Sequence, residues 1–383
     1  MPSHPAAGEH PGNAADVEFT AGWALPPGTL LRAEIEARGM TQADLAARAK
    51  LTEKHVSQVM TGTVSLTPDV ALTFERSLGI PARTLLLAEA RYQAERSRQN
   101  AFTVLAKHET WARRFPLAEL KKKGVLNGTE RGGELVDVLL RFFGVAGPQA
   151  FENVSLVGIS GFRRAQHLNV DVYATATWLR LGEQQTVGHR LPAYDPDRLR
   201  RSLPQLRDLS GRTDGDAFAK ARQILAESGV ALAFVDGIKE SRACGATRWV
   251  TPTRPLIVLS ERYGYRDTLW FSLMHEVGHL LRHPRRRTFV NLVEDGDDTD
   301  GLEEEANVFA ADVLVPDRYR ERLLAATTLG EFEALAAEAA VDVSILAGRR
   351  GHLTGEWGKV QRLRKKLDVP DVAQAAKAPL VPT

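Results

Sequence analysis

The chain has 383 residues, of which 43% are hydrophobic and 26% are charged, and these ordinary globular values predict two or three folded domains. The net charge of +2 excludes a global electrostatic attraction to nucleic acid, and the single cysteine, Cys244, excludes an intramolecular disulfide framework. No apolar run approaches the roughly 20 residues of a membrane span, and no secretory signal pattern opens the chain. We therefore expect a soluble cytoplasmic protein without a membrane partner.

The N-terminal part of the chain is expected to be a disordered tail followed by an all-helical domain. Residues 1–25 are rich in Pro, Gly, Ala and polar groups, a composition that buries too little apolar surface to fold. Residues 26–90 show the apolar patterns of five short helices separated by caps and turns. Two of these helices, 41–49 and 53–60, are joined by a tight turn, which is typical of a helix-turn-helix.

The pattern over residues 26–90 resembles the Xre-type repressor domain, particularly antitoxins of the HigA kind. This resemblance implies that the second helix of the pair enters the major groove of a DNA operator. Gln42, at the start of the preceding helix, would then contact phosphate. The side chains that the second helix would offer to base edges are those of Glu53, Lys54, His55, Ser57 and Gln58.

The same bundle has an alternative interpretation as a protein-interaction or dimerisation module. Residues 28–88 include seven basic and six acidic residues, a net charge of +1 that predicts little non-specific affinity for DNA. Sequence-specific binding would then depend on a homodimer. Residues 91–123 include nine basic and three acidic residues, a net charge of +6. For this segment we favour a solvated helix face over a track along the DNA backbone.

Residues 91–204 are interpreted as a helical connector in which we identify no chemistry. They include a predicted core helix over 174–182 that ends at Gly182. These helices are expected to join the two functional domains or to pack against the second one.

The second domain is expected over residues 205–350 and begins with a helix and a small sheet. Periodicity predicts the helix over 216–229, and β-type runs predict strands at 230–235, 245–250 and 255–260. The last two strands read as a hairpin-like pair. The edge strand of such a sheet could hold an extended peptide by strand addition.

Residues 270–281 combine an apolar run of helical length with the sequence His-Glu-x-x-His. His275 and His279 are four residues apart, so they share one helix face and can offer imidazole nitrogens to one metal ion. Glu276 follows about 100° round the helix, near the metal without being a ligand, which is the position of a general base. Pro284 is expected to set the end of the helix. A small sheet that leads into such a helix has the order of a zincin.

A tetrahedral metal site with an open position needs one more protein ligand. A second predicted helix, closed by Pro316, begins with the candidates Glu303, Glu304 and Glu305. His-Glu-x-Gly-His followed by Glu-x-Glu-Ala-Asn-x-Phe-Ala-Ala-x-x-Leu-x-Pro resembles the ImmA/IrrE family of metallopeptidases. The resemblance implies that Glu303 is the third ligand and that Asn307 is a hydrogen-bonding partner of the ligands. Glu304 and Glu305 remain as the alternatives.

Taken together, the two resemblances imply a DNA-binding zinc-dependent endopeptidase that regulates transcription, in which manganese could replace zinc. Zinc would lower the pKa of bound water towards about 7 and polarise the scissile carbonyl, while Glu276 would move the proton to the leaving amine. Arg248 and Tyr265 are loose candidates for an oxyanion donor. Members of the family cleave helix-turn-helix repressors. Because the DNA-binding module is here on the same chain, the substrate is expected to be a separate repressor, a toxin–antitoxin component or the chain itself.

The alternative function is a non-proteolytic transcription regulator or antitoxin whose metallopeptidase-like domain senses a ligand or binds a partner. Both interpretations share one fold class, a mostly helical α+β protein. Its expected parts are an N-terminal five-helix domain, a helical connector, and a C-terminal zincin-like domain with a small sheet.

Four weaker signals have structural interpretations. His283 extends the histidine series by another turn and is expected to interact with the terminal carbonyls of its helix. Cys244 is expected to be a structural residue near a turn. Residues 282–300 are interpreted as a solvated surface loop, with a substrate-gating lid as the alternative. Residues 351–383 are interpreted as a helix followed by an Ala/Pro-rich, disordered tail.

Overall fold

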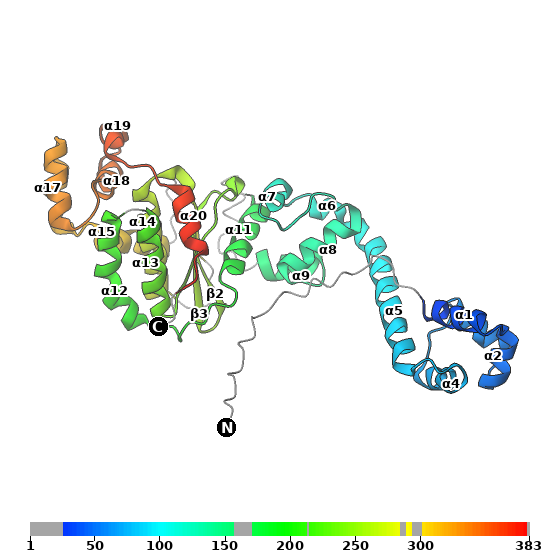
Figure 1. Ribbon diagram of the computed structural model, residues 1–383. Helices are drawn as coiled ribbons and strands as arrows, with labels where there is room; N and C mark the ends of the chain where they lie inside the picture. Colours follow the sequence, from blue (N-terminus) through cyan, green and yellow to red (C-terminus); the bar gives the residue numbers. More distant parts are fainter. Residues whose placement is uncertain (1–25, 157–170, 213, 284–288, 293–300, 381–383) are drawn as a thin grey trace, which may run out of the picture. The chain divides into compact units, whose positions relative to one another are not determined.

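The computed structural model describes residues 26–156, 171–212, 214–283, 289–292 and 301–380 (Figure 1). The tail expected at residues 1–25, and Pro284, lie outside the described residues. The chain divides into two compact units between Ala106 and Lys107. The predicted fold class, a mostly helical α+β protein with an all-helical N-terminal domain, is confirmed.

The N-terminal unit contains the predicted five-helix bundle. Its helix starts follow from side-chain caps: Thr41 accepts a hydrogen bond from the backbone N–H of Asp44, and the Asp44 carboxylate accepts one from the N–H of Thr41, which completes a capping box. The Thr52 side chain caps the next helix by accepting a hydrogen bond from the backbone N–H of His55. The helices are α1 (Pro27–Ala37), α2 (Gln42–Ala49), α3 (Glu53–Met60), α4 (Pro68–Leu78) and α5 (Ala82–Leu105).

Two features of this bundle are not evident from its sequence. Helix α5 continues to Leu105, so the domain end expected at residue 90 falls inside a helix. Helices α1 and α3 approach so closely at Gly28 that a Cβ on this residue would overlap the backbone of Met60. Only glycine fits at this position, which fixes how the first helix of the bundle crosses the third.

The C-terminal unit begins with short helices that pack around buried aromatic rings. Phe115 and Phe151 lie at the centre of this cluster, with ring centroids 5.2 Å apart in an edge-to-face arrangement. The cluster forms part of the same compact unit as the sheet. The helices are α6 (Glu109–Ala112), α7 (Leu117–Lys122), α8 (Gly132–Phe143), α9 (Pro148–Phe151) and α11 (Val172–Gln185).

Helix α11 packs against the sheet, so this part of the expected connector belongs to the second unit. The Trp178 Nε1–H donates a hydrogen bond to the carbonyl of Val235 over 3.1 Å. Gly182 does not end the helix, as the sequence predicted, because the helix continues to Gln185. Gly182 is instead the point of closest approach, since a Cβ there would lie 2.6 Å from a methyl group of Val258.

Four strands in the described part of the chain form one sheet in the order β1-β3-β2-β4. The predicted strands are confirmed as β1 (Ala231–Phe234), β2 (Ala243–Thr251) and β3 (Arg254–Leu259). β1 and β3 are parallel, and β2 and β3 are antiparallel. β4 (Phe289–Leu292) pairs antiparallel with β2, so part of the segment predicted as a surface loop is an edge strand.

Helix α11 covers one face of the sheet, and the helices on the other face share one large apolar core with it (Figure 1). Alternate residues of β3, such as Ile257 and Leu259, point into this core together with Met274 and Val277 of helix α14. The helices of this unit are α12 (Pro196–Asp208), α13 (Asp214–Glu227), α14 (Arg266–Arg282), α15 (Gly301–Leu314), α16 (Arg320–Ala325), α17 (Leu329–Ala339), α18 (Val343–Thr354), α19 (Trp357–Val360) and α20 (Val369–Lys377).

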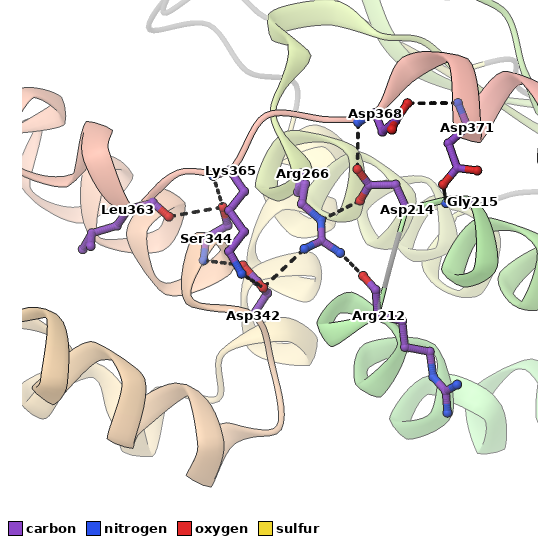
Figure 2. A network of polar contacts seen from close by, with 10 residues as sticks. All are labelled: Arg212, Asp214, Gly215, Arg266, Asp342, Ser344, Leu363, Lys365, Asp368 and Asp371. Atoms are coloured by element: carbon purple, nitrogen blue, oxygen red, sulfur yellow. Dashed lines mark hydrogen bonds and ion pairs between the residues drawn. The ribbon is translucent and has the colours of Figure 1, made fainter.

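The described C-terminal residues, up to Leu380, are an integral part of this unit, although their composition predicted a disordered tail. Helix α20 buries Val372 and Ala376 in the core, and Arg222 of α13 donates to the carbonyl of Ala375 over 2.7 Å. In Figure 2, Asp214 accepts hydrogen bonds from the Asp368 N–H and from Arg266. Long-range contacts, which composition does not reveal, fix this segment.

Within the described ranges, no helix is both long and apolar enough to cross a lipid bilayer.

Candidate metal centre

Helix α14 carries the first part of the site and lies deep in the C-terminal unit. It begins after Tyr265 and ends at Arg282, so the His-Glu-x-x-His sequence occupies its last two turns. The side chains of His275, Glu276 and His279 are all buried, with at most 2% of each residue exposed. Buried polar groups of this kind require partners, and their partners come from α15 and β2.

Helix α15 packs alongside α14 because a small residue allows a close approach. A Cβ on Gly278 would lie 2.9 Å from the ring of Phe309 and 3.4 Å from the Cα of Ala306. At this distance the start of α15 brings Glu303 to the histidine face of α14. The Glu303 carboxylate lies 3.1 Å from Nε2 of His275.

The structure brings the three predicted ligands together. Nε2 of His275 and Nε2 of His279 are 2.9 Å apart, and Oε2 of Glu303 lies 3.1 Å from the first and 3.5 Å from the second. One donor atom from each residue falls within 4.8 Å of the others. Tetrahedral zinc with bonds of about 2.0–2.2 Å separates its ligands by roughly 3.3 Å, so both the spacing and the donor set fit such an ion.

Among these three groups, the electrostatics favour an ionised carboxylate. Burial alone would raise the pKa of Glu303, but hydrogen bonds from His275 and His279 outweigh it and lower this pKa to about 2. Burial lowers the pKa of His279, which favours the neutral imidazole that binds metals. For His275 burial acts in the same direction, yet the hydrogen bond with Glu303 and nearby negative charge raise its pKa.

Glu276 points to strand β2. The Thr247 hydroxyl donates to its Oε2 over 2.8 Å, and a Cβ on Gly245 would lie 2.7 Å from its Oε1. Among the described residues, Oε1 has no hydrogen-bond partner. Complete burial raises the pKa of this carboxyl group to about 8, and the neighbouring His275 acts in the opposite direction. A cation at the cluster would further favour the ionised form.

A second set of contacts lies behind the histidines. Nδ1 of His275 is 2.9 Å from Oδ1 of Asn307, the partner that the family resemblance implied. Nδ1 of His279 is 2.8 Å from Nδ1 of His283, whose Nε2 lies 3.2 Å from Oε2 of Glu305. His283 therefore lies against the site, whereas its sequence position suggested an interaction with helix-end carbonyls.

The alternative metal ligands and the oxyanion candidates are exposed or contact residues other than the three of the cluster. Glu304 is exposed, and Glu305 contacts His283. Arg248 forms an ion pair with Glu183 of α11 at 2.9 Å. Tyr265 accepts a hydrogen bond from Gln361 at the opposite end of α14 from the histidines. None of these contacts directs either oxyanion candidate at the cluster.

Cys244 adjoins this region but has no reactive character. The thiol is buried, and burial raises its pKa to about 12. A thiol with so high a pKa is almost entirely protonated at neutral pH and is a poor nucleophile. This agrees with the structural role expected from the sequence.

The residues expected to contact DNA lie on the solvent side of helices α2 and α3. The apolar face of α3 buries Val56, Val59 and Met60 in the bundle core. The remaining positions of α3 are exposed or half-buried, as is the start of α2. These positions are Gln42, Glu53, Lys54, His55, Ser57 and Gln58.

Sequence reasoning missed the residues that surround Glu276. Thr247 and Gly245 lie on a strand, and no local periodicity relates a strand residue to a helix residue some 30 positions later. A glycine inside a predicted strand does indicate a close approach by another group, and Gly245 carried that signal. The position of His283 beside the site was indicated in the sequence by its place as a third histidine at helical spacing.

Comparison with known families finds a match in each of two stretches of the chain. Residues 238–349 match the peptidase M78 family model, described as the IrrE N-terminal-like domain. Residues 31–85 match a helix-turn-helix family model. The predicted fusion of these two modules is confirmed. Searches of curated proteins and of solved structures gave no match.

Proposed function

We propose that this protein is a DNA-binding, zinc-dependent endopeptidase that regulates transcription by cleaving a helix-turn-helix repressor or a related regulator. One observation carries the proposal: two histidines of α14 and a glutamate of α15 converge within 4.8 Å, beside the buried carboxylate of Glu276 on α14. Such a set does not serve core packing, because the burial of His275, Glu276 and His279 is costly without compensating partners.

His275, His279 and Glu303 would hold the metal through Nε2, Nε2 and a carboxylate oxygen. Two histidines and one glutamate form a donor set of catalytic zinc sites, in which one position stays open. Zinc held there would supply Lewis acidity and lower the pKa of water to about 7, and manganese is the alternative ion. Asn307 accepts a hydrogen bond from Nδ1 of His275, which keeps Nε2 free for the metal.

Glu276 is the proposed general base. Its Oε2 is held by Thr247, while the buried Oε1 has no partner among the described residues and would be the oxygen that takes the proton of a metal-bound water. The same carboxyl group then donates this proton to the departing amine. Thr247 and Gly245 restrict where the carboxylate lies, so it can exchange the proton without reorienting.

The N-terminal bundle supports a role at DNA. Its match to a helix-turn-helix model is accompanied by an α3 face whose polar side chains are accessible. We propose that Glu53, Lys54, His55, Ser57 and Gln58 contact base edges, that Gln42 contacts phosphate, and that a homodimer provides two such surfaces. DNA binding would keep the peptidase near promoter-bound repressors.

A second candidate function is a non-proteolytic regulator whose metallopeptidase-like domain senses a ligand or binds a partner. The complete burial of Glu276, with its pKa raised to about 8, favours this candidate because a general base must be ionised and within reach of substrate. Under this alternative the cluster would stabilise the fold or respond to metal.

The decisive experiment replaces Glu276 by glutamine, which preserves size and removes the base. The full-length protein is co-expressed with the products of neighbouring genes, and their cleavage is followed by intact-mass analysis. Glu276→Gln should retain zinc and lose cleavage, whereas Glu304→Gln, at an exposed glutamate of α15, should cleave like the wild type. Equal switching of target genes by wild type and Glu276→Gln would establish the regulator instead. Zinc content is measured on the same preparations.

A further inference from the structure

The two histidines of the cluster each have a second nitrogen that points away from it. Because Nε2 of both residues lies in the cluster, each Nδ1 lies on the outer side. Nδ1 of His275 is 2.9 Å from the Asn307 amide oxygen. Nδ1 of His279 is 2.8 Å from Nδ1 of His283, so another imidazole occupies the corresponding place.

His283 is enclosed between the two helices of the site. It follows the last residue of α14, and only 1% of its side chain is exposed. Its Nε2 lies 3.2 Å from Oε2 of Glu305 on α15. A continuous polar row therefore runs from Glu305 through His283 to His279. Helix α15 thus provides Glu303 to the cluster itself and Glu305 to its periphery.

The protons along this row are fixed by the chemistry of its ends. If Nε2 of His279 binds a metal, this neutral ring must carry its proton on Nδ1 and donate it outward. Nδ1 of His283 must then be the acceptor, which places the proton of its neutral ring on Nε2. That N–H points at a carboxylate, the strongest acceptor that a side chain offers. Every group in the row has a complementary partner in this arrangement.

We propose that His283 and Glu305 are positioning residues that fix the tautomer and orientation of His279 for metal binding. The inference rests on the proposed metal centre. Metal-binding histidines commonly donate their other ring N–H to a carboxylate or a carbonyl. Here the carboxylate acts through an interposed imidazole, which spans the distance from the exposed end of Glu305 to the buried ring of His279.

The test measures the zinc affinity of the full-length protein by competition with a chromophoric chelator. His283→Ala should bind Zn²⁺ about 10- to 100-fold more weakly than the wild type. Glu305→Gln should fall between the two, because it keeps the shape of the carboxylate without its charge. Glu304→Gln is the matched control and should bind like the wild type, since Glu304 is an exposed neighbour on the same helix turn.

A spectroscopic measurement separates positioning from a general loss of stability. With Co²⁺ in place of zinc, His283→Ala should show altered visible absorption bands, whereas its far-ultraviolet circular dichroism without metal should match the wild type. If His283→Ala fails to fold, the half-exposed Glu305 provides the same comparison through Glu305→Gln.

The outcomes distinguish this inference from the metal centre on which it rests. Wild-type zinc affinity and an unchanged Co²⁺ spectrum in the His283→Ala and Glu305→Gln proteins would overturn the positioning role alone. Absence of zinc binding by the wild type would overturn the metal centre and the positioning role together. Weakened binding by His283→Ala with an unaffected Glu304→Gln control would support both.

Discussion

Gly245 leaves the space that the carboxylate of Glu276 occupies: a Cβ built on this glycine would lie 2.7 Å from Glu276 Oε1 and 3.0 Å from its Cγ. Both distances are shorter than van der Waals contact, and Glu276 is fully buried, so its side chain has little room to retreat. Glu276 on α14 therefore requires a glycine at position 245 of β2.

This relationship predicts the effect of Gly245→Ala. The added methyl group should displace the Glu276 carboxylate and reduce cleavage of a substrate by at least about tenfold, since small misplacements of catalytic groups are costly. Zinc content should stay at the wild-type level because the three ligands do not touch Gly245. Cleavage rate and zinc content are measured on one preparation, and Gly330→Ala, at a glycine with open space around it, is the control.

A second prediction concerns the hydrogen bond between Thr247 and Glu276. Thr247→Val removes the hydroxyl that lies 2.8 Å from Oε2 and leaves the shape of the side chain nearly unchanged. The buried carboxylate then loses its donor, and the protein should be less stable by about 1–3 kcal/mol in chemical unfolding. Thr247→Ser keeps the hydroxyl and should restore most of the lost stability. Identical unfolding curves for wild type and Thr247→Val would contradict the importance of this bond.

The metal ligands give a third prediction, in the form of a ranking. Glu303→Ala should reduce zinc content most, because its carboxylate lies 3.1 Å and 3.5 Å from the two ligand nitrogens. Glu305→Ala should have a smaller effect through His283, and Glu304→Ala should have none. The metal-to-protein ratio after dialysis against a weak chelator provides the measurement. Equal zinc content in wild type and His279→Ala would rule out the site.

The parts of this site that could be predicted from the sequence are those that depend on local spacing. His275 and His279 meet because residues four apart share a helix face, and this holds wherever the helix packs. Glu303 required the family resemblance, since spacing alone did not separate it from Glu304 and Glu305. In the structure only Glu303 of these three joins the cluster within the described residues.

The parts that could not be predicted depend on pairing between distant segments. Thr247 meets Glu276 across 29 positions, and Arg222 meets Ala375 across 153. The sequence predicts a loop at edge strand β4 because the four residues of this strand are flanked by charged stretches, and only the pairing with β2 makes it a strand. Composition likewise suggested a disordered C-terminus. This segment is instead held by an ionic network of Arg266, Asp214 and Asp342, because Asp214 accepts a hydrogen bond from the Asp368 N–H and Asp342 accepts one from Lys365.

That network gives a fourth prediction. The Arg266 guanidinium contacts Asp214 at 2.5 Å and Asp342 at 3.4 Å, and the two aspartate side chains are each 7% exposed (Figure 2). Arg266→Met should leave both carboxylates without this partner and destabilise the C-terminal unit by about 3–5 kcal/mol. Urea unfolding followed by tryptophan fluorescence measures the loss. Arg362→Met, at an exposed arginine of the C-terminal segment, should change the free energy of unfolding little.

The last prediction tests the DNA-binding half of the proposal through Gln58 on α3. Its side chain is half-buried on the outer face of the helix, whereas the neighbouring Val59 belongs to the bundle core. If Gln58 reads a base edge, Gln58→Ala should lose about 1–3 kcal/mol of discrimination between the operator and a mismatched site. Binding to non-specific DNA should change little, because phosphate contacts determine that affinity.

Gln99→Ala is the matched control for this substitution, since Gln99 is an exposed glutamine on α5. Operator and mismatched duplexes are compared by fluorescence anisotropy at one fixed salt concentration. The zinc content of Gln58→Ala should equal that of the wild type, because the metal centre belongs to the other compact unit. If no substitution along the α3 face alters discrimination, the bundle is a protein-interaction module. The chain would then reach its repressor substrate through protein contacts and not through the operator.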